Sequence, residues 1–236
     1  MIRSTIATAG FALAGLGLAP GPARAQGCAG YPGTDLALVR VAASAASYTY
    51  ASAVGVSVTA GRVVYGTLSY RRIRDPELDA TSRERVVELG VDLKLLGRAY
   101  VCPLFAFSDA DGPGNLALTG TNFRFATQEY GLGAGMPIRL SARWSVSASA
   151  EYRSILLTST RSNPSTLITR RSQDVYQLWS GGVAVTFDGQ LTLRVGASTP
   201  VGFTLVADGP QELSSAFGRE ERELSWNFAL GWSFFR

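Results

Sequence analysis

Three carboxylates, Glu84, Glu88 and Asp92, follow one another at intervals of four residues. A β-strand rises about 3.3 Å per residue, so successive members of this series share one face but lie roughly 13 Å apart, too far to share a proton. The chain has no histidine, which excludes Ser-His and Cys-His nucleophiles and the commonest metal ligand. A Ser-Lys pair would need Lys94, and no serine motif marks its partner. We therefore predict a protein that is not an enzyme and that holds no cofactor and no metal.

The composition is that of a folded chain with little surface charge. Of the 236 residues, 46% are hydrophobic and 17% are charged, against roughly 25% charged in an average soluble domain. The formal net charge is +4, and loss of Arg3 and Arg24 with the leader predicted below leaves 20 basic and 18 acidic side chains. A chain so close to neutral has no basic field suited to nucleic acid.

The first 25 residues have the pattern of a cleaved secretory signal peptide. Arg3 supplies the positive start, residues 6–19 form the apolar core, and residues 23–25, Ala-Arg-Ala, form the small-x-small cleavage site. The apolar core is shorter than the roughly 20 residues that a transmembrane helix needs. We predict a signal peptide over residues 1–25, an N-terminal periplasmic tail over 26–35 and a single domain over 36–236.

Beyond the leader, hydrophobic residues repeat with a period of two. The clearest example is the C-terminal segment, where Trp226, Phe228, Leu230, Trp232 and Phe234 alternate with small or polar residues. No 3.6-residue period persists over a dozen positions, so helices do not organise this chain. Ten strands are expected, at about 36–46, 51–60, 63–74, 83–95, 98–108, 123–137, 143–158, 174–187, 190–201 and 219–235.

The expected connections alternate between tight turns and longer links. This alternation is typical of an up-and-down membrane barrel, which has short periplasmic turns, longer extracellular loops and, here, both chain ends on the periplasmic side. Eight strands is the alternative, because the first two segments are rich in Ala and Ser and are weakly patterned. The turns fall near 61–62, 97–98, 137–143 and 188–189, and the links near 47–50, 75–82, 109–122, 160–173 and 202–218.

The residue types indicate which face of the strands is outside. In a soluble β-sandwich or lipocalin-like barrel the apolar face would point inward, and the polar face would carry charged residues for water. Here the polar-parity positions are mostly Ser, Gly, Ala and Asn, which suit a crowded interior. Trp226, Phe228, Trp232 and Phe234 lie on the apolar face of the last strand, as expected for a lipid-facing aromatic strand. We therefore predict a transmembrane barrel.

If the apolar parity faces lipid, the remaining charged residues of the strands point into the lumen. They include five acids and five bases, so we expect a self-neutralising network rather than a channel lined by one sign. Gly131, Gly133 and Gly135 are expected to leave room for long lumen side chains from neighbouring strands. The predicted lumen network consists of Arg40, Arg71, Glu84, Glu88, Asp92, Lys94, Glu129, Glu151, Arg153 and Arg194.

The two cysteines, Cys28 and Cys102, are expected to form a disulfide in an exported chain. Cys102 follows a predicted turn by four residues and has lumen parity, so it should lie inside the barrel near the periplasmic mouth. The predicted tail begins at the same end, and a bridge would hold residues 26–35 at or across that mouth. Two buried free thiols are the alternative.

In its leader, amphipathic meander, alternating loop lengths and aromatic last strand, the chain resembles the small bacterial outer-membrane barrels of the OmpA, OmpX and opacity-protein kind. The resemblance implies an integral outer-membrane protein whose partners are membrane lipid, lipopolysaccharide and the barrel-insertion machinery. That machinery usually reads a terminal phenylalanine, whereas this chain continues through Phe235 to Arg236.

No ligand-binding or catalytic motif accompanies the resemblance. The favoured function is a non-enzymatic structural, anchoring or adhesion role through the extracellular loops, and the alternative is a small porin-like channel. A lipid-modifying or proteolytic barrel enzyme is the third hypothesis. The link at 160–173 carries Arg161, Arg170 and Arg171, which are candidates for contact with lipopolysaccharide phosphates.

Overall fold

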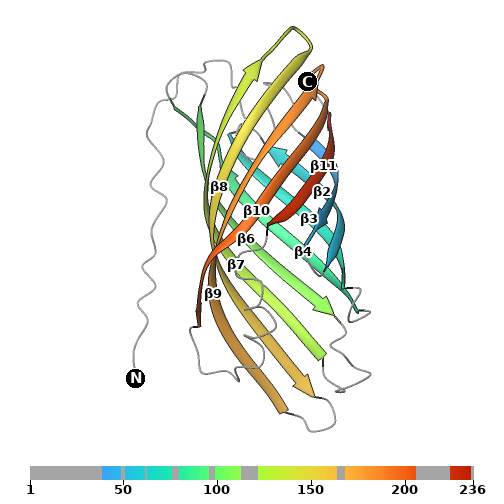
Figure 1. Ribbon diagram of the computed structural model, residues 1–236, viewed down its shortest axis with the longest axis vertical. Helices are drawn as coiled ribbons and strands as arrows, with labels where there is room; N and C mark the ends of the chain where they lie inside the picture. Colours follow the sequence, from blue (N-terminus) through green and yellow to red (C-terminus); the bar gives the residue numbers. More distant parts are fainter. Residues whose placement is uncertain are drawn as a thin grey trace.

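A computed structural model describes residues 39–48, 51–61, 63–75, 80–95, 99–112, 122–163, 168–205 and 224–234. These residues form one antiparallel sheet whose strands are inclined around a common axis (Figure 1). Within these ranges no helix has the length and apolar character needed to cross a membrane. The predicted signal peptide and tail lie outside the described residues. The strands are β1 (Val39–Ser47), β2 (Ser52–Gly61), β3 (Val64–Asp75), β4 (Ala80–Val91), β5 (Leu93–Lys94), β6 (Tyr100–Gly112), β7 (Asn122–Arg139), β8 (Trp144–Asn163), β9 (Ile168–Phe187), β10 (Leu191–Leu205) and β11 (Ser225–Phe234).

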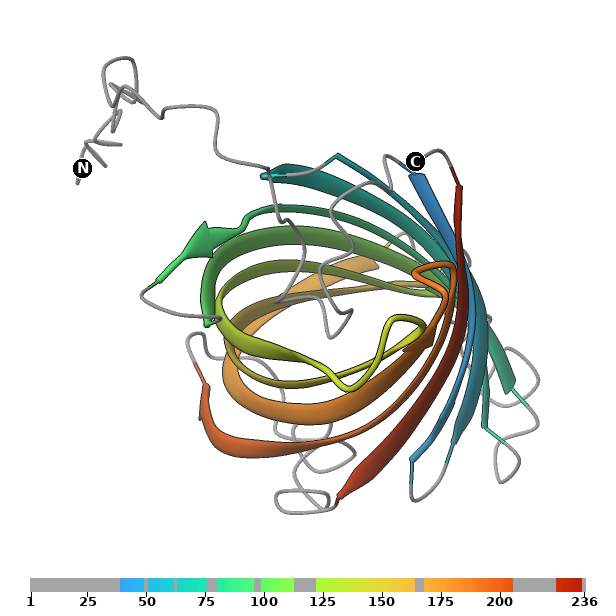
Figure 2. The same cartoon turned by 90° about the horizontal axis from the view of Figure 1, so that it is seen from above.

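Ten of these strands close into a barrel (Figure 2). The order around the ring is β4-β3-β2-β1-β11-β10-β9-β8-β7-β6, and pairing of β4 with β6 completes it. The two-residue strand β5 pairs with β6 beside the ring. The prediction of a ten-stranded antiparallel barrel is confirmed. The eight-strand alternative is wrong, because β1 pairs along its whole length with both β2 and β11.

The two ends of the barrel differ in their connections. Brief turns join β2 to β3, β7 to β8 and β9 to β10 at one end, which we call the short-turn end. The first residue of β1 and the last of β11 pair with each other at this end, Val39 opposite Phe234. At the opposite, long-loop end, residues 113–121 connect β6 to β7 and residues 206–224 connect β10 to β11. In Figure 1 the short-turn end is uppermost.

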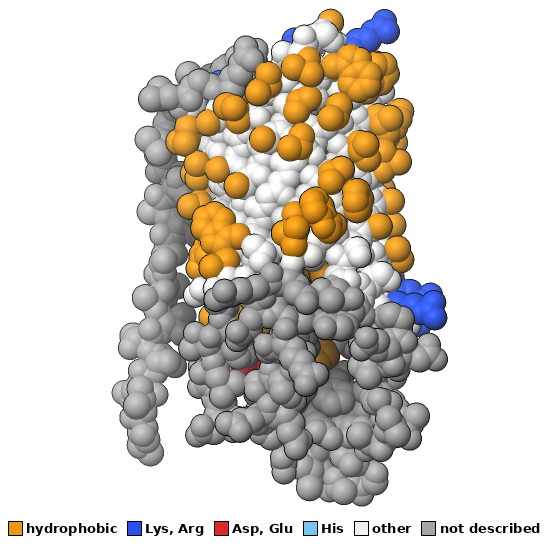
Figure 3. Space-filling view, viewed as in Figure 1, with side chains coloured by type: hydrophobic (Ala, Val, Ile, Leu, Met, Phe, Trp, Pro, Cys, Tyr) orange, Lys and Arg blue, Asp and Glu red, His pale blue; other side chains and the backbone are white. Residues whose placement is uncertain are grey.

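The outer face of the barrel is apolar. Along β11, Trp226, Phe228, Leu230, Trp232 and Phe234 are all exposed, with Leu230 at 53%, whereas the intervening residues are buried or half-buried. On the side drawn in Figure 3, hydrophobic side chains cover the middle of the barrel, and Lys and Arg side chains lie at its two ends. The soluble alternative is therefore wrong, because its apolar face would have pointed inward.

Aromatic pairs mark the two edges of the apolar surface on β8 and β9. Trp144 contacts Phe187 near the short-turn end, with ring centroids 4.8 Å apart, and Tyr152 contacts Trp179 with centroids 5.2 Å apart. The two pairs are eight residues apart on each strand, about 26 Å along the strand axis. A strand tilt of about 40° reduces this to about 20 Å, close to the roughly 25 Å apolar band of outer-membrane barrels.

Strands β8 and β9 extend well beyond the segments predicted for them. The sequence predicts strands at 143–158 and 174–187 and a long link over 160–173, whereas each strand has 20 residues and only four residues connect them. The link prediction is wrong because pairing continues past the apolar repeat, with Ser159 opposite Ser172 and Arg161 opposite Arg170. The resulting hairpin projects furthest of all strands at the long-loop end (Figure 1).

Candidate functional site in the barrel lumen

A cluster of ion pairs inside the barrel joins three strands. Arg153 of β8 donates from Nη2 to Glu88 of β4 and from Nη1 to Glu129 of β7, both at 2.8 Å. Its Nε also donates to Glu151, two residues earlier on β8. The four side chains are between 12% and 19% exposed. One guanidinium therefore ties β4, β7 and β8 together across the intervening strand β6.

Small residues on the wall give this cluster its space. Ala106 of β6 stands in register between Glu88 and Glu129 and is fully buried beneath them. Gly131 of β7 stands in register with Arg153, and a Cβ there would lie 2.8 Å from a methyl group of Leu104. At both positions the sequence therefore places a small residue where a long lumen side chain passes.

A second ion pair lies on the neighbouring wall. Arg71 of β3 and Glu84 of β4 are directly opposite in register, with Nε 3.2 Å from the carboxylate. The Arg71 side chain crosses Gly55 of β2, where a Cβ would lie 2.7 Å from its Cγ. Although Arg71 points inward, 37% of its side chain is exposed, so the lumen beside it has room for water.

The other four predicted lumen residues do not join these ion pairs. Arg40 is buried and donates from Nε to Ser233 of β11 at 3.1 Å. Asp92 is buried after the end of β4, and Arg194 is half-buried with no hydrogen-bond partner for its Nε. Lys94 lies in β5 beside the ring and is exposed, so its predicted place inside the lumen is wrong. The short strand β5 leaves the ring at Asp92, where the sequence predicts one continuous strand over 83–95.

The charges of the lumen clusters do not balance. Two arginines face four glutamates, because the remaining predicted bases lie elsewhere. The expectation of a network that neutralises itself holds for Arg71 with Glu84, but Arg153 alone serves three carboxylates. This part of the lumen therefore carries a net negative charge.

Pairs of hydroxyl groups, which the sequence patterns do not predict, also face the lumen within the described part of the chain. Each pair joins residues directly opposite on neighbouring strands, so that neither hydroxyl is left without a partner. The available signal was the symmetry of hydroxyl residues about a turn, as for residues 186 and 192 about the turn at 188–190. The pairs are Thr59–Thr67 at 3.0 Å, Ser108–Thr127 and Thr186–Thr192 at 2.8 Å, and Ser198–Ser225 at 2.7 Å.

Cys102 faces the lumen and is fully buried, with its Sγ 2.7 Å from a carboxylate oxygen of Asp92. Cys28 lies outside the described residues, so the bridge between the cysteines stays a prediction.

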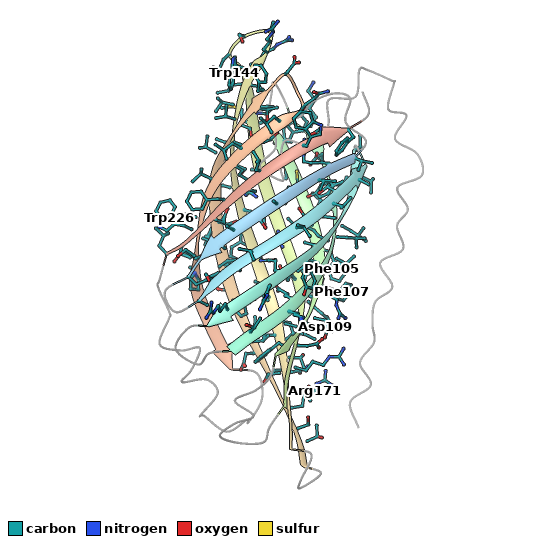
Figure 4. All side chains as sticks on the ribbon, turned by 90° about the vertical axis from the view of Figure 1, so that its right-hand side faces the viewer. Phe105, Phe107, Asp109, Trp144, Arg171 and Trp226 are labelled. Carbon is teal, nitrogen blue, oxygen red and sulfur yellow. The ribbon has the colours of Figure 1, made fainter. Side chains whose placement is uncertain are left out.

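Among the loop arginines, Arg171 is exposed near the end of the β8–β9 hairpin (Figure 4). The side chains of Arg161 and Arg170 also lie outside the described part.

Among the described residues, no group of three or more carboxylate or thiol side chains is placed to hold a metal ion. A closed antiparallel barrel satisfies its backbone hydrogen bonds internally, and here it presents an apolar outer band with aromatic edges and a polar interior. Fold and surface together define an outer-membrane β-barrel.

No protein-family model matches the sequence, and no curated protein matches it. Solved structures with a similar fold include the translocator domain of autotransporter NalP from Neisseria meningitidis, at 12% identity and a TM-score of 0.47, covering 84% of this chain and 88% of that one. The N-terminal barrel of Pseudomonas aeruginosa OprF matches at 14% identity with a TM-score of 0.34, covering 83% and 96%. The KdgM porin matches at 9% identity with a TM-score of 0.38, covering 83% and 99%. The assignment of the fold rests on the geometry of this barrel and not on these distant likenesses.

Proposed function

We propose that this protein is an integral barrel of the bacterial outer membrane with a non-enzymatic anchoring or adhesion role. In this proposal the long-loop end faces the outside, because bacterial barrels have short periplasmic turns and longer extracellular loops. Membrane lipid and lipopolysaccharide surround the apolar band, and the insertion machinery delivers the chain to the membrane.

The Arg153 cluster is the observation that carries this proposal. Ion pairs from three strands of one wall project into the lumen and take up space that a channel would need. The bulky lumen residues Tyr65, Leu104 and Ile155 are also buried. A barrel braced in this way is suited to hold a structure at the cell surface rather than to pass solutes.

The β8–β9 hairpin is the described part of the molecule best placed to make surface contacts. It extends beyond β10, whose pairing with β9 ends at Asp174, whereas β7 pairs with β8 as far as Ser162. Removing residues 160–171 and joining Ser159 to Ser172 with a two-residue turn should leave the barrel intact and reduce attachment of cells to surfaces. Unchanged attachment at equal barrel abundance would contradict a role of this hairpin in adhesion.

Single-channel recording in planar bilayers tests the lumen directly. The folded wild-type barrel should show no sustained conductance at neutral pH. The triple variant Arg153→Ala, Glu88→Gln, Glu129→Gln should conduct. It removes the guanidinium and the negative charges of two of its partners. Sustained conductance of the wild type would contradict the anchoring proposal and favour a channel.

A small porin-like channel is the second candidate, and one observation favours it. The four adjacent strands β10, β11, β1 and β2 present mostly Gly, Ala and Ser to the lumen, opposite the strands that carry the ion pairs. Such a channel would select cations, because the glutamates outnumber the arginines in the two ion-pair clusters.

A further inference from the structure

Arginines gather on the outer face of the barrel, at the long-loop ends of β3 and β4. Arg72 and Arg74 of β3 and Arg83 and Arg85 of β4 alternate with lumen residues and are exposed to the outside. In Figure 3 the Lys and Arg side chains at the lower right lie at this end of these two strands. The next strands around the ring from β3 are β2, β1, β11 and β10. In their long-loop halves, no described residue carries an outward charge.

The register places like charges directly against each other. Arg72 is the cross-strand partner of Arg83, and Arg85 stands opposite Tyr70. Directly opposed like charges destabilise a sheet. The nearby acids lie on β6, where Asp111 is the cross-strand partner of Arg83 and Asp109 is that of Arg85. Asp111 lies 3.9 Å from Arg85, and Asp109 holds a bidentate pair with Arg124. Within the described part of the chain, no carboxylate forms an ion pair with Arg72 or Arg83.

The cluster also borders the apolar band. Nearer the middle of the barrel, Leu68 lies opposite Val87, and both are exposed. This row is one outward row from Tyr70 and Arg85 and two outward rows from Arg72 and Arg83. Beside them on β6, Phe107 is exposed, and Phe105, Phe107 and Asp109 follow one another toward the long-loop end (Figure 4). Two residues along a strand correspond to roughly 7 Å, so Arg85 lies roughly 7 Å from this apolar row, and Arg72 and Arg83 lie roughly 13 Å from it.

We propose that Arg72 and Arg83, with Arg74 and Arg85 beside them, form a binding site for the phosphorylated headgroup of an outer-leaflet glycolipid, with its acyl chains lying on Leu68, Val87 and Phe107. A phosphate between Arg72 and Arg83 removes the repulsion of the opposed guanidiniums, and each fork suits bidentate bonding to phosphate oxygens. The apolar residues two rows nearer the middle of the barrel supply the acyl contact that free phosphate lacks. This site rests on the proposed outer-membrane location and orientation, and it is separate from the loop arginines of the β8–β9 hairpin.

Binding of lipid A to the full-length barrel, folded in detergent micelles, tests the site. The probe is fluorescent bisphosphorylated lipid A, compared with the same lipid after enzymatic removal of its phosphates and with inorganic phosphate as a competitor. The wild type should bind the phosphorylated lipid at least about tenfold more tightly than the dephosphorylated one, and Arg72→Gln with Arg83→Gln should abolish that preference. The control, Arg139→Gln with Arg143→Gln, removes two exposed arginines from the short-turn end and should leave binding unchanged.

A second readout separates the site from general charge. In lipid-free micelles Arg83→Gln should raise the unfolding temperature, because it removes a like charge that stands opposite Arg72 in register, whereas lipid A should protect the wild type more than this variant. Equal binding of the double variant and the wild type overturns the proposal. Full competition by millimolar inorganic phosphate also overturns it, since a lipid would then not be the ligand. Heat-modifiable migration in gels reports the folded barrel independently, so loss of lipid binding is distinguishable from failure of the barrel assignment.

Discussion

Replacement of Arg153 by Met tests whether the ion-pair cluster stabilises the barrel. The substitution retains the aliphatic length of the side chain but leaves Glu88, Glu129 and Glu151 without their shared cation. Breaking an enclosed ion pair typically costs about 3–5 kcal/mol, because the remaining charge stays unpaired. Here the carboxylates keep 12% to 15% of their side-chain surface exposed and are partly hydrated. We therefore expect the lower end, about 3 kcal/mol, for Arg153→Met.

Urea unfolding followed by tryptophan fluorescence measures this cost. Trp144, Trp179, Trp226 and Trp232 all lie on the lipid-facing surface, so loss of the membrane environment changes their emission. With a denaturant slope of about 2 kcal/mol per molar, a loss of about 3 kcal/mol lowers the midpoint by about 1.5 M. Arg153→Lys should fall between the wild type and Arg153→Met, since one ammonium cannot reproduce the forked contacts of a guanidinium.

A control ties the loss to the unpaired carboxylates rather than to packing. Adding Glu88→Gln and Glu129→Gln to Arg153→Met should restore at least half of the lost stability. An Arg153→Met midpoint equal to that of the wild type would refute the reasoning. So would a loss that the glutamine substitutions do not reverse.

Four further substitutions probe the lipid face, the lumen packing and the outer charges. Leu230→Arg, near the middle of β11, should cost about 2–4 kcal/mol in vesicles, whereas Trp232→Arg, close to the short-turn end, should cost about 0–1 kcal/mol; the reverse order in urea unfolding would show that the band is misplaced. Gly90→Ala should cost about 1–3 kcal/mol by thermal unfolding, because its Cβ would lie 2.3 Å from the ring of Tyr65, and an unaffected variant would mean that the ring moves freely. Outside the apolar band, the hydrogen bonds and charge of its arginine partner hold the pKa of Asp109 below its ordinary value. The stability from this pair is present at neutral pH and is lost as the pH falls through that lowered pKa, so Asp109→Asn should unfold with a smaller acid dependence below about pH 4.

The sequence predicts the strands well where they cross the membrane and poorly where they leave it. Lipid on one face and a crowded lumen on the other impose an alternation of apolar residues with small or polar ones. This alternation is present in residues 143–158 and 174–187. Beyond that zone water meets both faces, so the alternation stops while backbone pairing continues. Thr160 opposite Arg171 is an example: the pair is in register in β8 and β9 but carries no hydrophobic pattern.

Parity predicts that a charge faces inward, but it does not predict which partner that charge meets. The partner depends on the stagger of neighbouring strands around the whole ring. Arg153 stands in register with Gly131, not with Glu129, and it reaches Glu88 only because Ala106 lies between the two glutamates on the wall. The sum of pairings from β4 to β8 sets this arrangement, and no local pattern contains it.

Strand parity also explains why the sequence did not predict a role for the outward arginines. Arg72 and Arg83 have the parity of the lipid face, and an inventory of lumen charges leaves that parity out. A charge on the lipid face is costly near the middle of the membrane and inexpensive at its edge, so its position along the strand decides its meaning. Arg72 lies two positions beyond Tyr70, the last exposed aromatic residue of β3. Arg83 lies four positions beyond Val87, the last exposed hydrophobic residue of β4, with Arg85 between them. Outward arginines at strand ends are therefore evidence about the lipid headgroups, just as inward ones are evidence about the lumen.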